Sequence, residues 1–145
     1  MNEGMVGSTY VAEPFEVSAV KIAEFARATH AENRAHFDAE AAAKVGAPAV
    51  VAPPTFVVST AQAAEKLFLD DPRSGADFSR IVHGGEELSF VRPIVAGDVL
   101  TTDYTVESVT VKATLTITRG RSEVRDQRGM LVATAVSTMI QREGK

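Results

Sequence analysis

The sequence predicts an α+β fold in which one buried helix packs against an antiparallel sheet. Residues 52–68, APPTFVVSTAQAAEKLF, form the only long helical pattern without a fully charged face. From Arg80 to Gln141 the chain instead alternates apolar and polar residues in long runs, as β-strands do. Several strands that follow a helix in this way favour a sheet that carries the helix on one face.

Composition fits a globular protein of one domain, residues 1–145, with 45% hydrophobic and 23% charged residues. No apolar run approaches the ~20 residues that cross a bilayer. The start, MNEGMVGSTY, does not resemble a secretory signal, so we expect a cytoplasmic protein without a membrane partner. The chain lacks cysteine, which excludes disulfides and thiolate chemistry. A net charge of −4 argues against a nucleic-acid partner.

The first fifty residues predict two short helices. Residues 6–17 are expected to be an irregular lead-in with one short extended piece. Ser18 is placed to cap a helix at 19–28, and Asp38 a second helix at 39–45. Both cap residues are of the types whose side-chain oxygen accepts a backbone N–H of the first turn.

The long helix is expected to begin at Pro53 and Pro54, whose fixed φ suits a first turn. Small and apolar residues recur along it at spacings of three and four, which places them on one face. This stripe consists of Val57, Thr60, Ala61, Ala64, Leu67 and Phe68. After a loop at 70–77, strands are expected at 79–92 (bent at Gly84–Gly85), 99–111, 113–125 and 130–141.

Two segments resemble a known family. The segment SRIVHGGEELSFVRPIVAGDVL, with its Arg92-Pro93 and Gly97-Asp98 pairs, and the helix entry APPTF are similar to MaoC-like (R)-3-hydroxyacyl dehydratases. They are most similar to the N-terminal type, which includes the single hot-dog subunits HadA and HadC. The resemblance covers roughly residues 6–140. It implies a hot-dog fold, an antiparallel sheet wrapped around a central helix at about residues 54–68.

The resemblance also implies where the chemistry lies. Competent relatives carry the signature Gly-Asp-x-Asn-Pro-x-His-x-Asp, and the matching segment here is HAENRAHFD at 30–38. Asn33, His36 and Asp38 match, so the resemblance implies that His36 is the proton carrier and that Asn33 orients substrate or water. Ala31 stands at the aspartate position, and Glu32 is displaced from it by one residue. The catalytic motif is therefore expected to be degenerate.

The implied reaction is reversible loss of water from a 3-hydroxyacyl thioester, which needs a proton carrier and donors to the thioester oxygen. Proline has no N–H, so Thr55 and Phe56 are the first expected oxyanion donors of the long helix. From the residues alone, the favoured interpretation of His36 is a packed or solvent-facing side chain in a loop. Asn33 is equally well interpreted as a turn or cap residue. The sequence predicts neither a cofactor nor a metal site, since it lacks a phosphate loop and ligands at metal-binding spacing.

Three functions remain open. The first is a dehydratase subunit of fatty-acid metabolism that binds an acyl-ACP or acyl-CoA thioester and stabilises a catalytic MaoC-like partner. This subunit would form a heterodimer with that partner, or a homodimer if the partner is absent. The second is an active homodimeric enoyl-CoA hydratase using His36 with Asn33 or Glu32. The third is a non-catalytic acyl-thioester-binding module. In each, arginines such as Arg73, Arg80 and Arg92 are candidates to meet carrier-protein carboxylates or coenzyme A phosphates.

Overall fold

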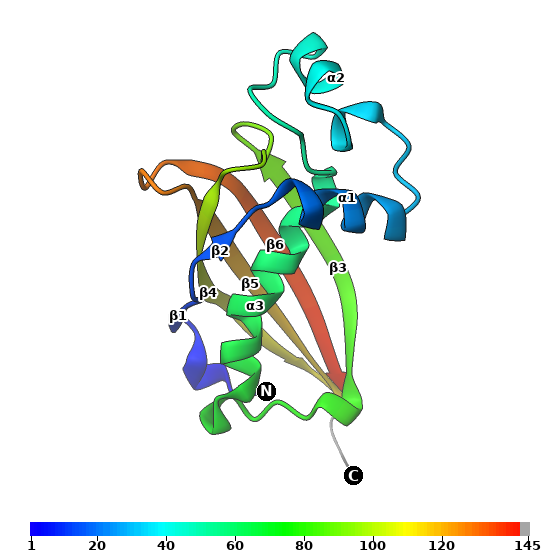
Figure 1. Cartoon of the computed structure of the whole chain (residues 1–145). Helices are drawn as coiled ribbons and strands as arrows, with labels where there is room; N and C mark the ends of the chain where they lie inside the picture. Colours follow the sequence, from blue (N-terminus) through cyan, green and yellow to red (C-terminus); the bar gives the residue numbers. More distant parts are fainter. Residues whose placement is uncertain (143–145) are drawn as a thin grey trace.

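A computed structural model describes residues 1–142 and consists of a curved antiparallel sheet with a long helix in its hollow (Figure 1). The strands are β1 (Thr9–Val11), β2 (Phe15–Glu16), β3 (Ile81–Phe90), β4 (Val99–Lys112), β5 (Leu115–Arg125) and β6 (Leu131–Arg142). The helices are α1 (Ala19–Ala28), α2 (Ala39–Lys44) and α3 (Val57–Asp70), and a 3₁₀ turn, Pro54–Phe56, leads into α3.

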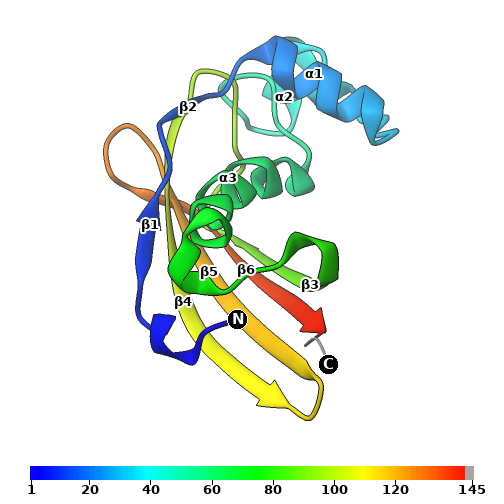
Figure 2. The same cartoon turned by 90° about the horizontal axis from the view of Figure 1, so that it is seen from below.

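The sheet follows the order β1-β4-β5-β6-β3, and β2 also pairs with β4. Strand β3 therefore joins β6, the last strand, and no strand of residues 1–142 pairs with its other edge. The sheet bends around α3, as Figure 2 shows. This is the hot-dog arrangement that the family resemblance implied.

Helix α3 lies across the concave face and divides the core into two clusters. Near its start, Val57 packs with Leu100 and Val124, and near its end Phe68 packs with Tyr104. Full burial of each such side chain stabilises the fold by roughly 1.5–3 kcal/mol. The apolar stripe of the helix is confirmed by this packing.

One member of the predicted stripe was wrong. Leu67 is 42% exposed, because successive residues of a helix point about 100° apart and Phe68 already faces the sheet. A charged residue takes the inward position instead, since Glu65 is only 7% exposed. Hydrophobic spacing alone did not identify this buried carboxylate.

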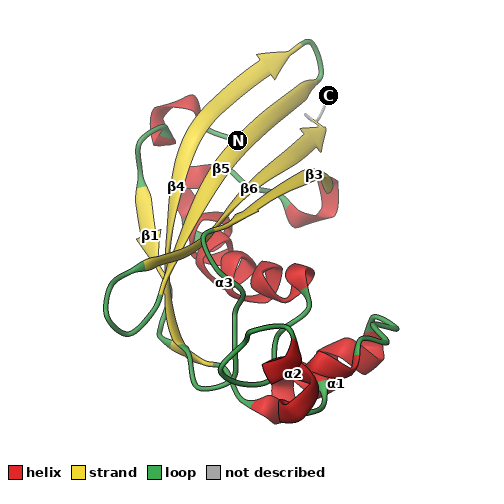
Figure 3. Ribbon diagram, turned by 90° about the horizontal axis from the view of Figure 1, so that it is seen from above, coloured by secondary structure: helices red, strands yellow, loops and turns green. Residues whose placement is uncertain are grey.

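Helices α1 and α2 lie together beyond one end of the sheet (Figure 3). Both predicted caps are confirmed: Ser18 Oγ accepts the Lys21 N–H at 3.1 Å, and Asp38 Oδ1 accepts the Glu40 N–H at 2.9 Å. The lead-in at 6–17 differs from the prediction, because it forms two short strands rather than one extended piece. Both pair with β4, which is long enough to offer each a partner.

The four long strands match their predicted positions to within two residues. The predicted bend in β3 is also present, as an irregularity of register between His83 and Gly85. A Cβ at Gly84 would lie 2.9 Å from Ile140 Cδ1 and 3.3 Å from Thr138 O, so glycine lets β6 approach there without displacing the end of Ile140. Within residues 1–142, no helix combines the length and the apolar character needed to cross a membrane.

Candidate functional site

His36 lies buried at the end of a short 3₁₀ turn, Arg34–His36, and is 8% exposed. Its Nδ1 atom is 2.7 Å from the carbonyl oxygen of Val51. A carbonyl can only accept, so the neutral imidazole must carry its proton on Nδ1 and keep a lone pair on Nε2. The ring therefore has the tautomer that a general base requires, with one nitrogen anchored and the other available.

Asn33 forms the cap of the same turn. Its Oδ1 accepts the Ala35 N–H at 3.0 Å, and the residue is otherwise exposed. This matches the cap role that the sequence had left open for Asn33. The side chain is not among those that line the cavity beside His36, so the structure does not bring the two predicted residues together there.

The cavity beside His36 has a volume of about 380 Å³ and is mainly apolar. It is formed by the segment before α3 and by the end of β3 with the residues that follow it. Its lining consists of His36, Val51, Ala52, Pro53, Pro54, Phe90, Val91, Arg92, Pro93 and Ile94. Of the described residues, only His36 and Arg92 bring an ionisable side chain to this lining. No carboxylate of residues 1–142 stands beside the imidazole in it.

Ala31 and Glu32 do not supply the missing carboxylate in this lining. Ala31 is half-buried, and its N–H donates to Ala26 O in the last turn of α1 at 2.8 Å. Glu32 is exposed. Neither residue lines the His36 cavity.

The two predicted oxyanion donors differ in the structure. The Phe56 N–H donates to Pro53 O at 2.9 Å within the 3₁₀ turn, so it is already engaged. The Phe56 ring is 2% exposed and packs edge-on against Phe15 and Phe25 in the core. Thr55 is exposed at the same turn, and neither residue is among those that line the His36 cavity, so the role of the Thr55 N–H stays a prediction.

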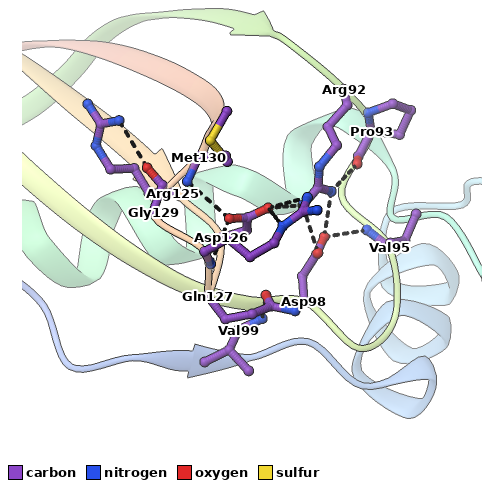
Figure 4. Close-up of polar contacts among 11 residues, drawn as sticks. Arg92, Pro93, Val95, Asp98, Val99, Arg125, Asp126, Gln127, Gly129 and Met130 are labelled. Atoms are coloured by element: carbon purple, nitrogen blue, oxygen red, sulfur yellow. Dashed lines mark hydrogen bonds and ion pairs between the residues drawn. The ribbon is translucent and has the colours of Figure 1, made fainter.

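Arg92 stands at the centre of a network that the sequence did not reveal (Figure 4). Its guanidinium donates two hydrogen bonds to Asp98, at 2.9 and 2.8 Å, and one to Asp126 at 3.1 Å. A fourth goes to Pro93 O at 2.9 Å. The network links the wall of the His36 cavity to the turn between β5 and β6. With four hydrogen bonds made inside the protein, the guanidinium is directed at these oxygens rather than at a ligand.

Asp126 is 4% exposed and is held by charged and backbone donors. Burial acts to raise its pKa, but hydrogen bonds from Arg128, the Met130 N–H and Arg92 outweigh it and hold the pKa well below the usual range. The carboxylate is therefore ionised over all ordinary pH values. Asp126 lies between the strands expected at 113–125 and 130–141, but nothing local links it to Arg92, which is 34 residues away in sequence.

A second cavity, of about 630 Å³, adjoins the first and shares Val51, Arg92 and Pro93 with it. Of the other arginines named above, Arg73 binds Asp71 through Nε and Nη2, and Arg80 lies 3.3 Å from Asp77. Neither lines either of these two cavities. Within residues 1–142, no three His, Asp or Glu side chains are grouped as metal ligands would be.

Comparisons with known proteins cover nearly the whole chain. A family model described as "FAS1-like, dehydratase domain region" matches residues 4–135. A UPF0336 protein of Streptomyces coelicolor is 42% identical over 143 residues, which span 98% of this chain and 95% of that protein.

Solved structures of dehydratases also match this chain. A chain of the C-terminally truncated HadBC complex of Mycobacterium tuberculosis, a 3R-hydroxyacyl-ACP dehydratase, matches with a TM-score of 0.84 and 30% identity over 94% of this chain and 96% of that chain. A protein described as a MaoC-like dehydratase matches with a TM-score of 0.89 and 30% identity. That match covers 98% of this chain but 43% of the other, so the likeness there is to part of a longer protein.

Proposed function

The chain belongs to the FAS1-like dehydratase region family and to the UPF0336 proteins, and on that premise we propose that it is a subunit of an (R)-3-hydroxyacyl-thioester dehydratase. Its substrate would be an acyl chain carried as a thioester on acyl carrier protein or coenzyme A. In this proposal its own catalytic motif is degenerate, and a MaoC-like partner supplies the missing group.

The observation that supports this is the His36 cavity. It offers one anchored imidazole in an apolar lining without a carboxylate from residues 1–142. Dehydration must remove a proton from C2 and release the C3 hydroxyl as water, so two proton movements have to be served. An imidazole without a second acid or base is poorly equipped for both. The complete site would therefore form only with a second chain.

Strand β3 is where we expect that chain to pair. Its outer edge has no partner strand among residues 1–142. Val82 in this strand is 60% exposed, and Val91 just after it is 70% exposed. Pairing along this edge would satisfy the backbone donors and acceptors that an open edge leaves exposed. Phe90 and Val91 also line the His36 cavity, so a chain joined there would lie next to it. The relative in the HadBC complex is itself part of an assembly of different chains.

Hydration of trans-2-enoyl-CoA, the reverse reaction, tests the proposal. We expect little turnover from the purified chain alone, and turnover when it is combined with a MaoC-like protein that carries Asp-x-Asn-x-x-His. Turnover by the chain alone that disappears in His36→Ala would instead establish an independent hydratase. If neither preparation turns over while the chain still binds acyl thioesters, it is a binding module and the proposal fails.

Restoring the carboxylate is a sharper version of this test. Ala31→Asp is expected to raise hydration by the chain alone on the order of 10²-fold, the lower range of what a positioned acid or base contributes. Glu32→Gln is the matched control, because Glu32 is the neighbouring residue and is exposed, whereas Ala31 is half-buried. An Ala31→Asp chain that folds and gains nothing would contradict the view that the missing aspartate limits the site.

A further inference from the structure

We propose that Arg92 is a positioning residue that fixes the imidazole of His36 through Asp98 and two short backbone segments. This deepens the proposed function, since His36 is the proton carrier there. Its test reads the ring directly and does not depend on turnover, so it can fail without the proposed function failing.

The first step leads from Arg92 to Asp98. The two groups form a paired contact, Nη1 to Oδ2 at 2.9 Å and Nη2 to Oδ1 at 2.8 Å. Asp98 is 5% exposed, and its Oδ2 also accepts the Val95 N–H at 3.0 Å. The carboxylate therefore closes the turn at residues 95–98, in which Gly97 takes the left-handed conformation with φ +97°.

The second step leads from that turn to the segment before α3. Val95 and Val51 form an isolated antiparallel bridge. On either side of it, the Ala52 N–H donates to Ile94 O at 2.8 Å and the Ala96 N–H to Val50 O at 2.9 Å. Residues 50–52 are thus held to residues 94–96 by a short ladder.

The third step leads from Val51 to the ring. Because backbone groups alternate in direction along an extended segment, Val51 points its N–H and C=O away from residues 94–96. Its N–H donates to Ala35 O at 3.0 Å, and its C=O accepts from His36 Nδ1 at 2.7 Å. The imidazole therefore occupies a place in the ladder that a backbone N–H would fill in a sheet. Any displacement of residues 94–98 would be passed to the acceptor that selects its tautomer.

An arginine suits this position because its planar fork meets a carboxylate with two parallel hydrogen bonds. A lysine keeps the charge but cannot make the paired contact. Arg92 also holds Asp126 at 3.1 Å, which ties the turn at 95–98 to the turn between β5 and β6. These contacts come from three separate parts of the chain, so the position of Val51 O is set from outside its own segment.

The test is nuclear magnetic resonance of the full chain with ¹⁵N-labelled histidine, at a pH where the imidazole is neutral. In the unaltered chain we expect the Nδ1–H tautomer and a slowly exchanging Nδ1 proton. In Arg92→Lys we expect that proton to exchange on the order of tenfold faster, the factor given by loss of about one net hydrogen bond, and the tautomer preference to be lost. Asp98→Asn, which removes the charge on the other side of the contact, should act in the same way.

Arg73→Lys is the matched control. Arg73 also holds an aspartate, Asp71, through more than one contact, but at the far end of α3. It should leave the His36 signals unchanged. A folded Arg92→Lys or Asp98→Asn chain with the original His36 signals overturns the proposal. Loss of the fold in both variants overturns it equally, because the network would then support the whole chain and not the ring.

Discussion

Tyr104 is fully buried and lies against Gly120 of the neighbouring strand. A Cβ atom at position 120 would be 2.0 Å from the Tyr104 hydroxyl oxygen and 2.3 Å from Cε2. These separations are far below van der Waals contact. The strand can pass so close to the tyrosine because glycine has no side chain.

Gly120→Ala is therefore expected to destabilise the protein by about 3 kcal/mol, the upper range for overpacking of a core. The measurement is the free energy of unfolding in urea. Gly85→Ala is the matched control, since a Cβ there meets nothing within 4 Å. Equal effects of the two substitutions would show that the close approach to Tyr104 does not matter.

At the scale of elements, α3 carries a carboxylate into its contact with the sheet. Glu65 accepts a hydrogen bond from Ser137 Oγ of β6. Burial raises the pKa of Glu65, and the hydrogen bond from Ser137 lowers it by less. The protonated form is thus favoured in the folded state more than in the unfolded state.

The raised pKa of Glu65 determines how the free energy of unfolding changes with pH. A carboxyl whose pKa is raised on folding lowers stability as the pH rises above its unfolded value of 4.5, because the ionised form must be buried. Glu65→Gln keeps an acceptor for Ser137 and removes that cost. Its free energy of unfolding should equal that of the unaltered chain near pH 4 and exceed it near pH 8. Glu24→Gln, on the exposed side of α1, controls for the loss of one charge. An equal gain at both pH values would contradict this account.

The elements that were predicted correctly are those that local patterns determine. The caps at Ser18 and Asp38 act on residues two or three positions away, and the long strands alternate over ten residues or more. Strand β2 was missed because two residues carry no pattern, and only β4 makes them a strand. A second irregularity, between Val106 and Ser108 in β4, was likewise invisible, since register belongs to a pair of strands.

The contacts of the candidate site could not be predicted either, because they join residues that are distant in sequence. His36 was found through a short motif, but its partner Val51 lies 15 residues away. The Arg92 network joins residues 6 and 34 positions apart. No spacing rule connects such residues before the sheet is built. Glu65 was missed for another reason, because a charged residue in an apolar stripe is normally assigned to the exposed side.

At the scale of the whole molecule, we expect chains to associate along the open edge of β3. Val82→Lys would place a charge on this edge, a device by which natural sheets prevent pairing. We expect it to weaken association with a partner chain, measured by analytical ultracentrifugation, with little change in the thermal midpoint of the lone chain. Thr110→Lys, exposed at the far end of β4, should leave association intact. Unchanged assembly in Val82→Lys would exclude this edge as the interface.

The hydrogen bond from His36 to Val51 O uses Nδ1 only, so the structural role of this residue can be separated from its proposed role in proton transfer. His36→Asn keeps an N–H donor close to the position of Nδ1, so the hydrogen bond to Val51 O should be kept while the proposed proton carrier is lost. The His36→Asn chain should fold and still associate with the partner chain. In a cell that makes both forms it would be dominant-negative, lowering hydration activity in proportion to its share of the total. Undiminished activity in mixed assemblies would show that His36 is dispensable there.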